Sequence, residues 1–216
     1  MTDAGRITVL IVDDDPFVRR GVADIFRAAP DILVVGDASD GDEVFAAVRT
    51  FRPHVVLMDL KMKRVGGLEA TRMLMESSNP PKVVAMTSMD VDDLVVKSVA
   101  AGAHSFLSKD EPPHTFHQSV RVVAAGNTLF SPESLRRIVA AGGAIRESGP
   151  DLSRLTDRER DVLAVLAEGE PNADIGRRLF MSETTVKSHV SAILAKLGAR
   201  NRVEAALSAF RAGLVV

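Results

Sequence analysis

The stretch Val55-Val56-Leu57-Met58-Asp59 decides the fold, because four consecutive apolar residues run directly into a carboxylate. A strand buried on one face alternates apolar and polar residues, so an unbroken apolar run indicates a strand covered on both faces. Strands of this kind belong to parallel sheets, in which crossover helices cover both faces. The sequence around this stretch should therefore alternate between strands and helices.

That alternation is found on both sides of the stretch. Short apolar runs predict five strands, and segments with apolar residues near i, i+3 and i+4 predict the helices between them. The expected strands are 7–12, 32–38, 55–59, 82–87 and 105–108, and the expected helices are 17–29, 42–51, 68–77, 92–101 and 113–125. Residues 1–125 therefore predict an α/β domain, a flavodoxin-like (βα)5 fold with a parallel sheet.

Residues 126–151 interrupt this rhythm and predict a linker. The segment holds Gly142-Gly143 and Gly149-Pro150, and one short helix is expected near residues 132–140. Residues 152–216 then predict an all-α domain. Its first helix starts at a capping box formed by Thr156 and Glu159, and further helices are expected at about 172–179, 182–198 and 202–212.

The composition excludes several classes of protein. No apolar run is long enough to span a bilayer, so we expect no membrane association. The first residues lack a basic segment followed by a long apolar one, so we expect a cytoplasmic protein. The absence of cysteine excludes disulfides and thiolate metal sites. Basic charge is concentrated at the C-terminal end, where seven basic residues face two acidic ones from Arg177 onward.

Acidic and polar residues follow the expected strands of the first domain. Asp13 and Asp14 come after the first strand, Asp59 closes the third, Thr87 closes the fourth, and Lys109 lies just after the fifth. In a parallel sheet the carboxyl ends of the strands meet at one edge, where ligands bind. The sequence therefore predicts one site built from carboxylates, a hydroxyl and an ammonium group.

This acidic site predicts a Mg²⁺ ion and a nucleophile. Neighbouring carboxylates repel each other unless a cation neutralises them, and Mg²⁺ prefers hard oxygen ligands. The expected ligands are Asp14, Asp59 and the backbone carbonyl of Lys61, with Asp13 reaching the ion through water. Asp59 can accept a phosphoryl group as an acyl phosphate, while Lys109 and Thr87 stabilise the phosphoryl oxygens.

At these positions the chain resembles the receiver domain of bacterial response regulators. The resemblance covers roughly residues 7–125 and implies that a sensor histidine kinase phosphorylates Asp59, that Asp13 and Asp14 hold magnesium, and that Thr87 and Phe106 form the switch pair. Lys63 departs from the family, which usually has proline there, so we expect a more mobile loop. The matching motifs are Ile11-Val12-Asp13-Asp14-Asp15-Pro16, Leu57-Met58-Asp59-Leu60-Lys61-Met62, Met86-Thr87-Ser88 and Phe106-Leu107-Ser108-Lys109-Asp110.

The second domain has the pattern of a helix-turn-helix DNA reader. Apolar residues predict the joint between two helices, and an α-helix of this kind fits the major groove. Lys187, with Ser188 and Ser191 beside it, is expected to contact bases. Thr184, Lys196, Arg200 and Arg202 are expected to contact phosphates. The expected joint residues are Ala173, Ile175, Leu179, Val186, Val190 and Ile193.

This segment resembles the LuxR-type helix-turn-helix, which together with the receiver resembles the NarL/FixJ family of response regulators. The family resemblance implies a transcription factor switched by phosphorylation, DNA as a partner, and a homodimer in the phosphorylated state that uses the last helix. The matching motifs are Leu155-Thr156-Asp157-Arg158-Glu159-Arg160-Asp161-Val162-Leu163, Asn172-Ala173-Asp174-Ile175, Ser182-Glu183-Thr184-Thr185-Val186-Lys187-Ser188-His189-Val190 and Lys196-Leu197-Gly198-Ala199-Arg200.

Two other classes of function are less well supported. A phosphatase using an aspartyl phosphate would resemble a pattern with a second aspartate two residues after Asp59, where this chain has Lys61. We therefore expect no enzyme beyond a receiver that catalyses its own phosphorylation and dephosphorylation. An interaction module that is never phosphorylated is the other alternative, and the full set of receiver residues argues against it.

Overall fold

A computed structural model of the protein describes residues 5–88, 92–127 and 151–215, without the side chains of residues 92, 93, 95 and 96. The short helix expected near residues 132–140, Gly142-Gly143 and Gly149-Pro150 lie outside the described residues. The chain divides into two compact units.

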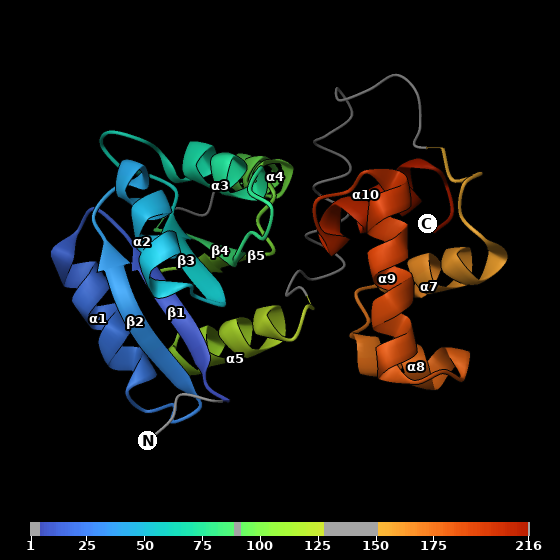
Figure 1. Ribbon diagram of the computed structural model, residues 1–216, viewed down its shortest axis with the longest axis horizontal. Helices are drawn as coiled ribbons and strands as arrows, with labels where there is room; N and C mark the ends of the chain where they lie inside the picture. The colour runs from blue at the N-terminus through green and yellow to red at the C-terminus, as the bar shows by residue number, and fades with distance from the viewer. Residues whose placement is uncertain (1–4, 89–91, 128–150, 216) are drawn as a thin grey trace. The chain divides into compact units, whose positions relative to one another are not determined.

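The first unit is built on a five-stranded parallel sheet in the order β2-β1-β3-β4-β5 (Figure 1). The order reverses between β1 and β3, the switch point at which sheets of this kind bind ligands. The α/β prediction is confirmed, and the strands begin and end where expected: β1 Ile7–Val12, β2 Ile32–Ala38, β3 Val55–Asp59, β4 Lys82–Thr87 and β5 Ser105–Ser108.

Helices connect the strands, with ends that differ slightly from expectation. The first helix stops at Phe26, three residues early, because Ala29 turns back to the Phe26 carbonyl and Pro30 disfavours helix before it. The helix expected at 42–51 starts as a short 3₁₀ turn, η1. The observed elements are α1 Pro16–Phe26, η1 Gly41–Glu43, α2 Val44–Phe51, α3 Gly67–Met75, α4 Asp92–Ala101 and α5 Pro113–Ala124.

Alternate residues of the central strands bury opposite faces of the sheet. Val9 and Ile11 of β1 join a core cluster with Phe26 of α1 and Phe116 of α5. The rings of Phe26 and Phe116 meet edge to face with centroids 6.5 Å apart. Leu10, on the other face of β1, is equally buried. Both faces are thus apolar, which explains the unbroken apolar run of β3.

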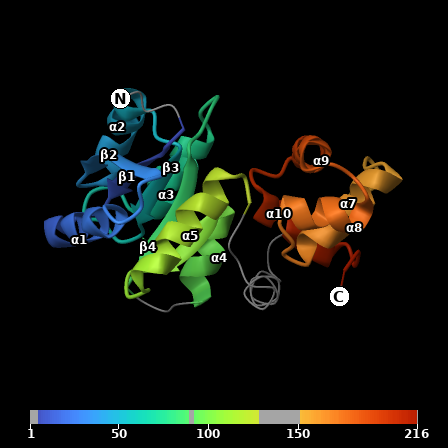
Figure 2. The same ribbon diagram turned by 90° about the horizontal axis from the view of Figure 1, so that it is seen from below.

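The described residues 151–215 contain four helices, as expected for an all-α domain. They are α7 Asp157–Ala167, α8 Asn172–Leu179, α9 Glu183–Leu197 and α10 Arg202–Arg211. The capping box of Thr156 and Glu159 is present at the start of α7. Figure 2 looks nearly along α9 and shows α7, α8 and α10 gathered on one side of it. In the described parts of the chain, no helix combines the length and apolar character needed to cross a bilayer.

Candidate functional site

The carboxyl ends of the parallel strands bring the expected site residues to one edge of the sheet. Asp13 follows β1, Asp59 ends β3 and Thr87 ends β4, and these three residues are 0%, 3% and 2% exposed. Lys109, just after β5, donates its backbone N–H to the Thr87 carbonyl at 2.8 Å. The register of the sheet thus fixes the backbone positions of these residues.

Three carboxylates of this edge lie close enough to share a cation. Asp13, Asp14 and Asp59 each offer an oxygen atom, and these atoms lie within 4.8 Å of one another. A set of hard anionic oxygens at this spacing suits Mg²⁺, which binds few protein carboxylates and keeps positions for water and phosphate oxygens. Asp15 has a different role: its side chain caps α1 by accepting a hydrogen bond from the Phe17 N–H at 2.8 Å.

Lys109 joins two of these carboxylates. Its Nζ lies 2.7 Å from Asp13 Oδ2 and 3.0 Å from Asp59 Oδ1, with 13% of the side chain exposed. Burial alone would lower the pKa of Lys109, but hydrogen bonds to Asp13 and Asp59 outweigh it, so the pKa is raised. The ammonium group therefore stays charged and keeps a positive charge beside Asp59.

The carboxylate of Asp59 is held in a poorly solvated place. Burial raises its pKa, and the charge of Asp13 acts in the same direction, while Lys109 and the backbone N–H of Lys61 lower it. Together these effects raise the pKa of Asp59 above its usual value. A poorly solvated carboxylate is a stronger nucleophile, and cations at this edge can stabilise the negative oxygens of the group that it attacks.

Thr87 and Phe106, expected as the switch pair, occur on the neighbouring strands β4 and β5. Thr87 is buried, whereas Phe106 is half-buried. Phe106 stands opposite Ala85 in the strand pairing, and Thr87 stands opposite Ser108. The two side chains thus belong to the same pair of strands at the end of the sheet that carries Asp59.

The loop after Asp59 is fastened by a carboxylate that the sequence reasoning missed. Asp40, only 2% exposed, accepts hydrogen bonds from the backbone N–H groups of Arg64 at 2.9 Å and Val65 at 2.8 Å. The Arg64 side chain pairs with Glu43 at 2.7 Å and Asp42 at 3.0 Å. Although proline is absent at position 63, the second half of the loop is therefore held in place.

A signal for Asp40 was present in the sequence. Asp40 lies two residues beyond the end of β2, and all strand ends of a parallel sheet reach the same edge. The residues that follow β2 therefore reach the same edge as those that follow the other four strands.

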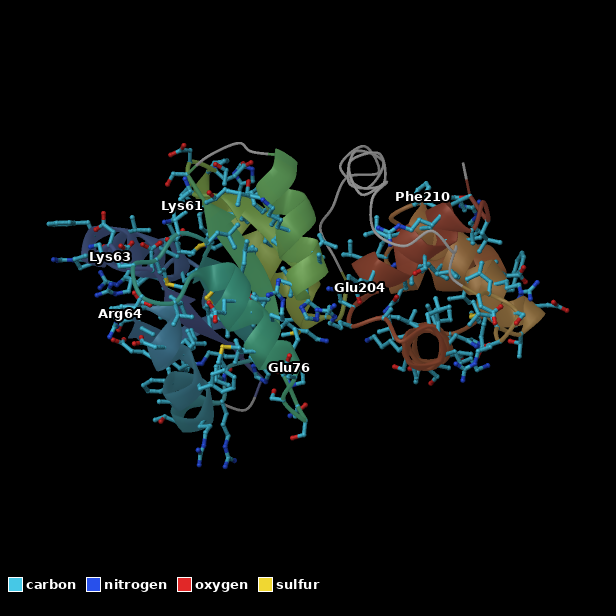
Figure 3. The ribbon with its side chains drawn as sticks, turned by 90° about the horizontal axis from the view of Figure 1, so that it is seen from above. Lys61, Lys63, Arg64, Glu76, Glu204 and Phe210 are labelled. Carbon is cyan, nitrogen blue, oxygen red and sulfur yellow. The ribbon has the colours of Figure 1, made fainter. Side chains whose placement is uncertain are left out.

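Lys63 makes an ion pair that was not expected. Its Nζ lies 3.5 Å from Asp14 Oδ2, with the Lys63 side chain 82% exposed and the Asp14 side chain 25% exposed. Figure 3 shows Lys61, Lys63 and Arg64 in succession along this loop. A second ammonium group thus stands beside the acidic cluster.

The exposed face of α9 carries four of the expected DNA-contacting residues. Thr184, Lys187, Ser188 and Ser191 follow one helical stripe and are all exposed. Lys187 pairs with Glu183 at 2.9 Å, and both side chains remain about half exposed. Such surface pairs contribute little, about 0.3–0.5 kcal/mol, so Lys187 can exchange this partner for another acceptor.

The other three expected contacts are placed differently. Lys196 donates to both oxygens of the buried Glu159, at 2.8 and 2.6 Å, which ties the end of α9 to the start of α7. Arg200 is exposed and lies 3.5 Å from Glu204.

Arg202, expected to contact a phosphate, has only 5% of its surface exposed. Its guanidinium donates to Asn172 Oδ1 at 2.9 Å and to the Glu170 carbonyl, both within the second unit. Burial lowers its pKa to about 10, so the group remains charged at neutral pH. Arg202 therefore joins α10 to α8 as a structural residue.

The joint between α8 and α9 is mostly as expected. Val186, Val190 and Ile193 of α9 and Ile175 of α8 are buried, whereas Ala173 is exposed and does not belong to the joint. Gly176 takes its place, because a Cβ there would lie 2.7 Å from the Met181 carbonyl oxygen. A side chain at position 176 would push the two helices apart.

Comparison with known proteins agrees with both units. The model of the "Response regulator receiver domain" family matches residues 9–121, and that of "Bacterial regulatory proteins, luxR family" matches residues 153–209. The chain is 36% identical over 212 residues to transcriptional regulatory protein LiaR of Bacillus subtilis (strain 168), covering 97% of this chain and 99% of that protein. It is also 36% identical over 209 residues to the nitrate/nitrite response regulator protein NarL of Escherichia coli (strain K12), covering 96% of each.

A solved structure supports the same assignment. The crystal structure of response regulator ChrA from a heme-sensing two-component system superposes with a TM-score of 0.53 at 33% identity, covering 98% of this chain and 100% of that one. The family matches lie on the two units described above, and the relatives share nearly the full length. The chain belongs to the NarL/FixJ family of response regulators, with a receiver domain followed by a LuxR-type DNA-binding domain.

Proposed function

We propose that a sensor histidine kinase phosphorylates Asp59 and that this modification switches sequence-specific DNA binding by α9. The observation that carries the proposal is the buried Asp59 carboxylate, which meets Lys109 at 3.0 Å beside two further carboxylates. We place the receiver domain in residues 1–125, the linker in 126–151 and the DNA-binding domain in 152–216. The protein would act in the cytoplasm.

The proposed chemistry is transfer of a phosphoryl group. An oxygen of Asp59 forms a bond to phosphorus while the bond from phosphorus to the donor breaks, and the leaving nitrogen of a phosphohistidine takes up a proton. Lys109 and the hydroxyl of Thr87 stabilise the phosphoryl oxygens. Water later attacks the same phosphorus and releases inorganic phosphate, so the receiver catalyses both its own phosphorylation and its own dephosphorylation.

Magnesium fits the acidic edge described above. Asp14, Asp59 and the backbone carbonyl of Lys61 would hold it, with Asp13 acting through a water molecule. A bound Mg²⁺ neutralises the carboxylates and the oxygens of the phosphoryl group.

On DNA, the exposed stripe of α9 would enter the major groove. Lys187, Ser188 and Ser191 would contact base edges, and Thr184 and Arg200 would contact phosphates. The ammonium group of Lys196 would contact a phosphate while it also pairs with Glu159. A homodimer of the phosphorylated protein would present two such helices.

Asp59→Asn tests the proposal. The variant should lose labelling by acetyl phosphate, measured as a mobility shift on a phosphate-binding gel, because an amide oxygen does not form the acyl phosphate. Labelling of the parent should also require Mg²⁺. Asp24→Asn, an exposed carboxylate of α1 paired with Arg27, is the matched control and should label like the parent. Equal labelling of the Asp59→Asn variant would show that another residue is the acceptor.

A further inference from the structure

We infer that Lys63 competes with Mg²⁺ for the carboxylate of Asp14 and so sets how tightly this receiver holds the ion. The inference rests on the proposed function of the acidic edge and concerns one residue at which this chain departs from the family pattern. It begins from the 3.5 Å contact between Lys63 Nζ and Asp14 Oδ2.

The three carboxylates differ in the cations that lie beside them. Lys109 is already placed between Asp13 and Asp59, at 2.7 and 3.0 Å. Lys63 pairs with Asp14. Asp14 is also the most exposed of the three carboxylates, so an incoming ion meets it first.

The loop directs Lys63 toward Asp14. The two residues that follow it, Arg64 and Val65, donate their backbone N–H groups to the buried Asp40. The Arg64 side chain pairs with the carboxylates of Asp42 and Glu43 in η1. The backbone next to Lys63 is therefore held in place, while the flexible Lys63 side chain extends to the acidic cluster.

Both cations require the same carboxylate. An ammonium group at 3.5 Å from Asp14 would lie close to an ion bound there, and like charges at that separation repel each other. Lys63 must therefore move away when Mg²⁺ binds. An exposed pair is easily broken, so removal of Lys63 should tighten Mg²⁺ binding by a modest factor, about three- to fivefold. Salt screening should reduce this factor.

Isothermal titration with MgCl₂ on the full chain tests this inference, and it suits a protein without Trp or Tyr. Lys63→Met keeps the length of the side chain and removes its charge. We expect its Kd for Mg²⁺ to fall about three- to fivefold at low salt, with a smaller difference at high salt. Arg72→Met removes the same charge from an exposed position of α3 and should leave the Kd within about twofold of the parent.

The outcomes separate this inference from the proposed function. If the Lys63→Met variant binds Mg²⁺ as the parent does, or more weakly, Lys63 is not a competitor, although the Mg²⁺ site itself stands. If Arg72→Met tightens binding equally, the effect is one of net charge and the inference is also overturned. If the parent binds no Mg²⁺ and Asp14→Asn changes nothing, both the inference and the proposed metal site fail.

Discussion

His104 precedes β5, and its imidazole ring is buried at the end of the sheet opposite to Asp59. Only 7% of the residue is exposed, and Nδ1 accepts a hydrogen bond from the Val83 N–H at 3.2 Å. Burial, helped by the positive charge of Lys82, lowers the pKa of His104 to about 3. The ring is therefore neutral in the folded protein throughout the physiological range.

This buried ring predicts a loss of stability in mild acid. The unfolded chain takes up a proton near pH 6.5, whereas the folded chain does not until about pH 3. The stabilisation is complete above pH 6.5 and is lost as the pH falls toward 3. Between pH 7 and pH 5 this group should lower the free energy of unfolding of the receiver by about 2 kcal/mol.

Urea denaturation followed by circular dichroism at pH 7, 6 and 5 measures this effect. His104→Asn keeps an acceptor near Nδ1 but does not titrate, so the free energy of unfolding of this variant should vary less with pH. The comparison is between the two pH slopes, because the variant has a lower stability at every pH. A His104 ring that titrates near 6.5 by NMR in the folded protein would contradict the prediction.

Among the elements, α9 gives the most specific prediction about DNA. Lys187 stands in the middle of the exposed stripe, and its pairing with Glu183 is weak. Lys187→Ala should weaken binding to the specific site by about 1–3 kcal/mol and binding to random duplexes by less, because a base contact is lost. Fluorescence anisotropy with a labelled duplex from a site occupied in the genome measures both affinities.

Arg200→Ala supplies the contrast on the same domain. A phosphate contact contributes equally on any sequence, so this variant should weaken both affinities and reduce the slope of log K against log salt by about one. Equal losses on specific and random DNA for the Lys187→Ala variant would assign Lys187 to a phosphate as well.

Elements were predicted better than side-chain partners, for a physical reason. The five strands followed from apolar runs that end in polar residues, and hydrophobicity is a property of each residue alone. Helix ends depend on local capping, so the end of α1 was predicted three residues too late. Arg202 was misplaced because its charge predicted a surface position, and only the fold shows that Asn172 and the Glu170 carbonyl are there to satisfy it.

The same distinction applies to the site. Asp13, Asp59 and Lys109 could be placed together because the sheet brings all strand ends to one edge. The pairing of Lys63 with Asp14 depends on the path of a loop, which no periodic pattern encodes. Contacts made by loop side chains are therefore the feature that the structure reveals and the sequence does not.

For the whole molecule, we predict that phosphorylation converts a monomer into a dimer that binds DNA. The phosphoryl group adds about 1.5 to 2 negative charges, and it draws Thr87 and Lys109 toward Asp59. Movement of Thr87 opens space into which the half-buried Phe106 turns, so the surface around β4 and β5 changes shape. That surface is then available to hold a second copy.

Dimerisation should raise DNA affinity by more than the sum of new contacts. Two α9 helices held about 34–36 Å apart would bind two half-sites together, and the second contact would form within the same complex. Sedimentation with and without beryllofluoride, a mimic of the acyl phosphate, should show a mass near twice that of the monomer together with tighter binding to paired half-sites. Asp59→Asn should show neither change. A mass and a DNA affinity that beryllofluoride leaves unaltered would mean that the DNA-binding domain acts without a phosphorylation switch.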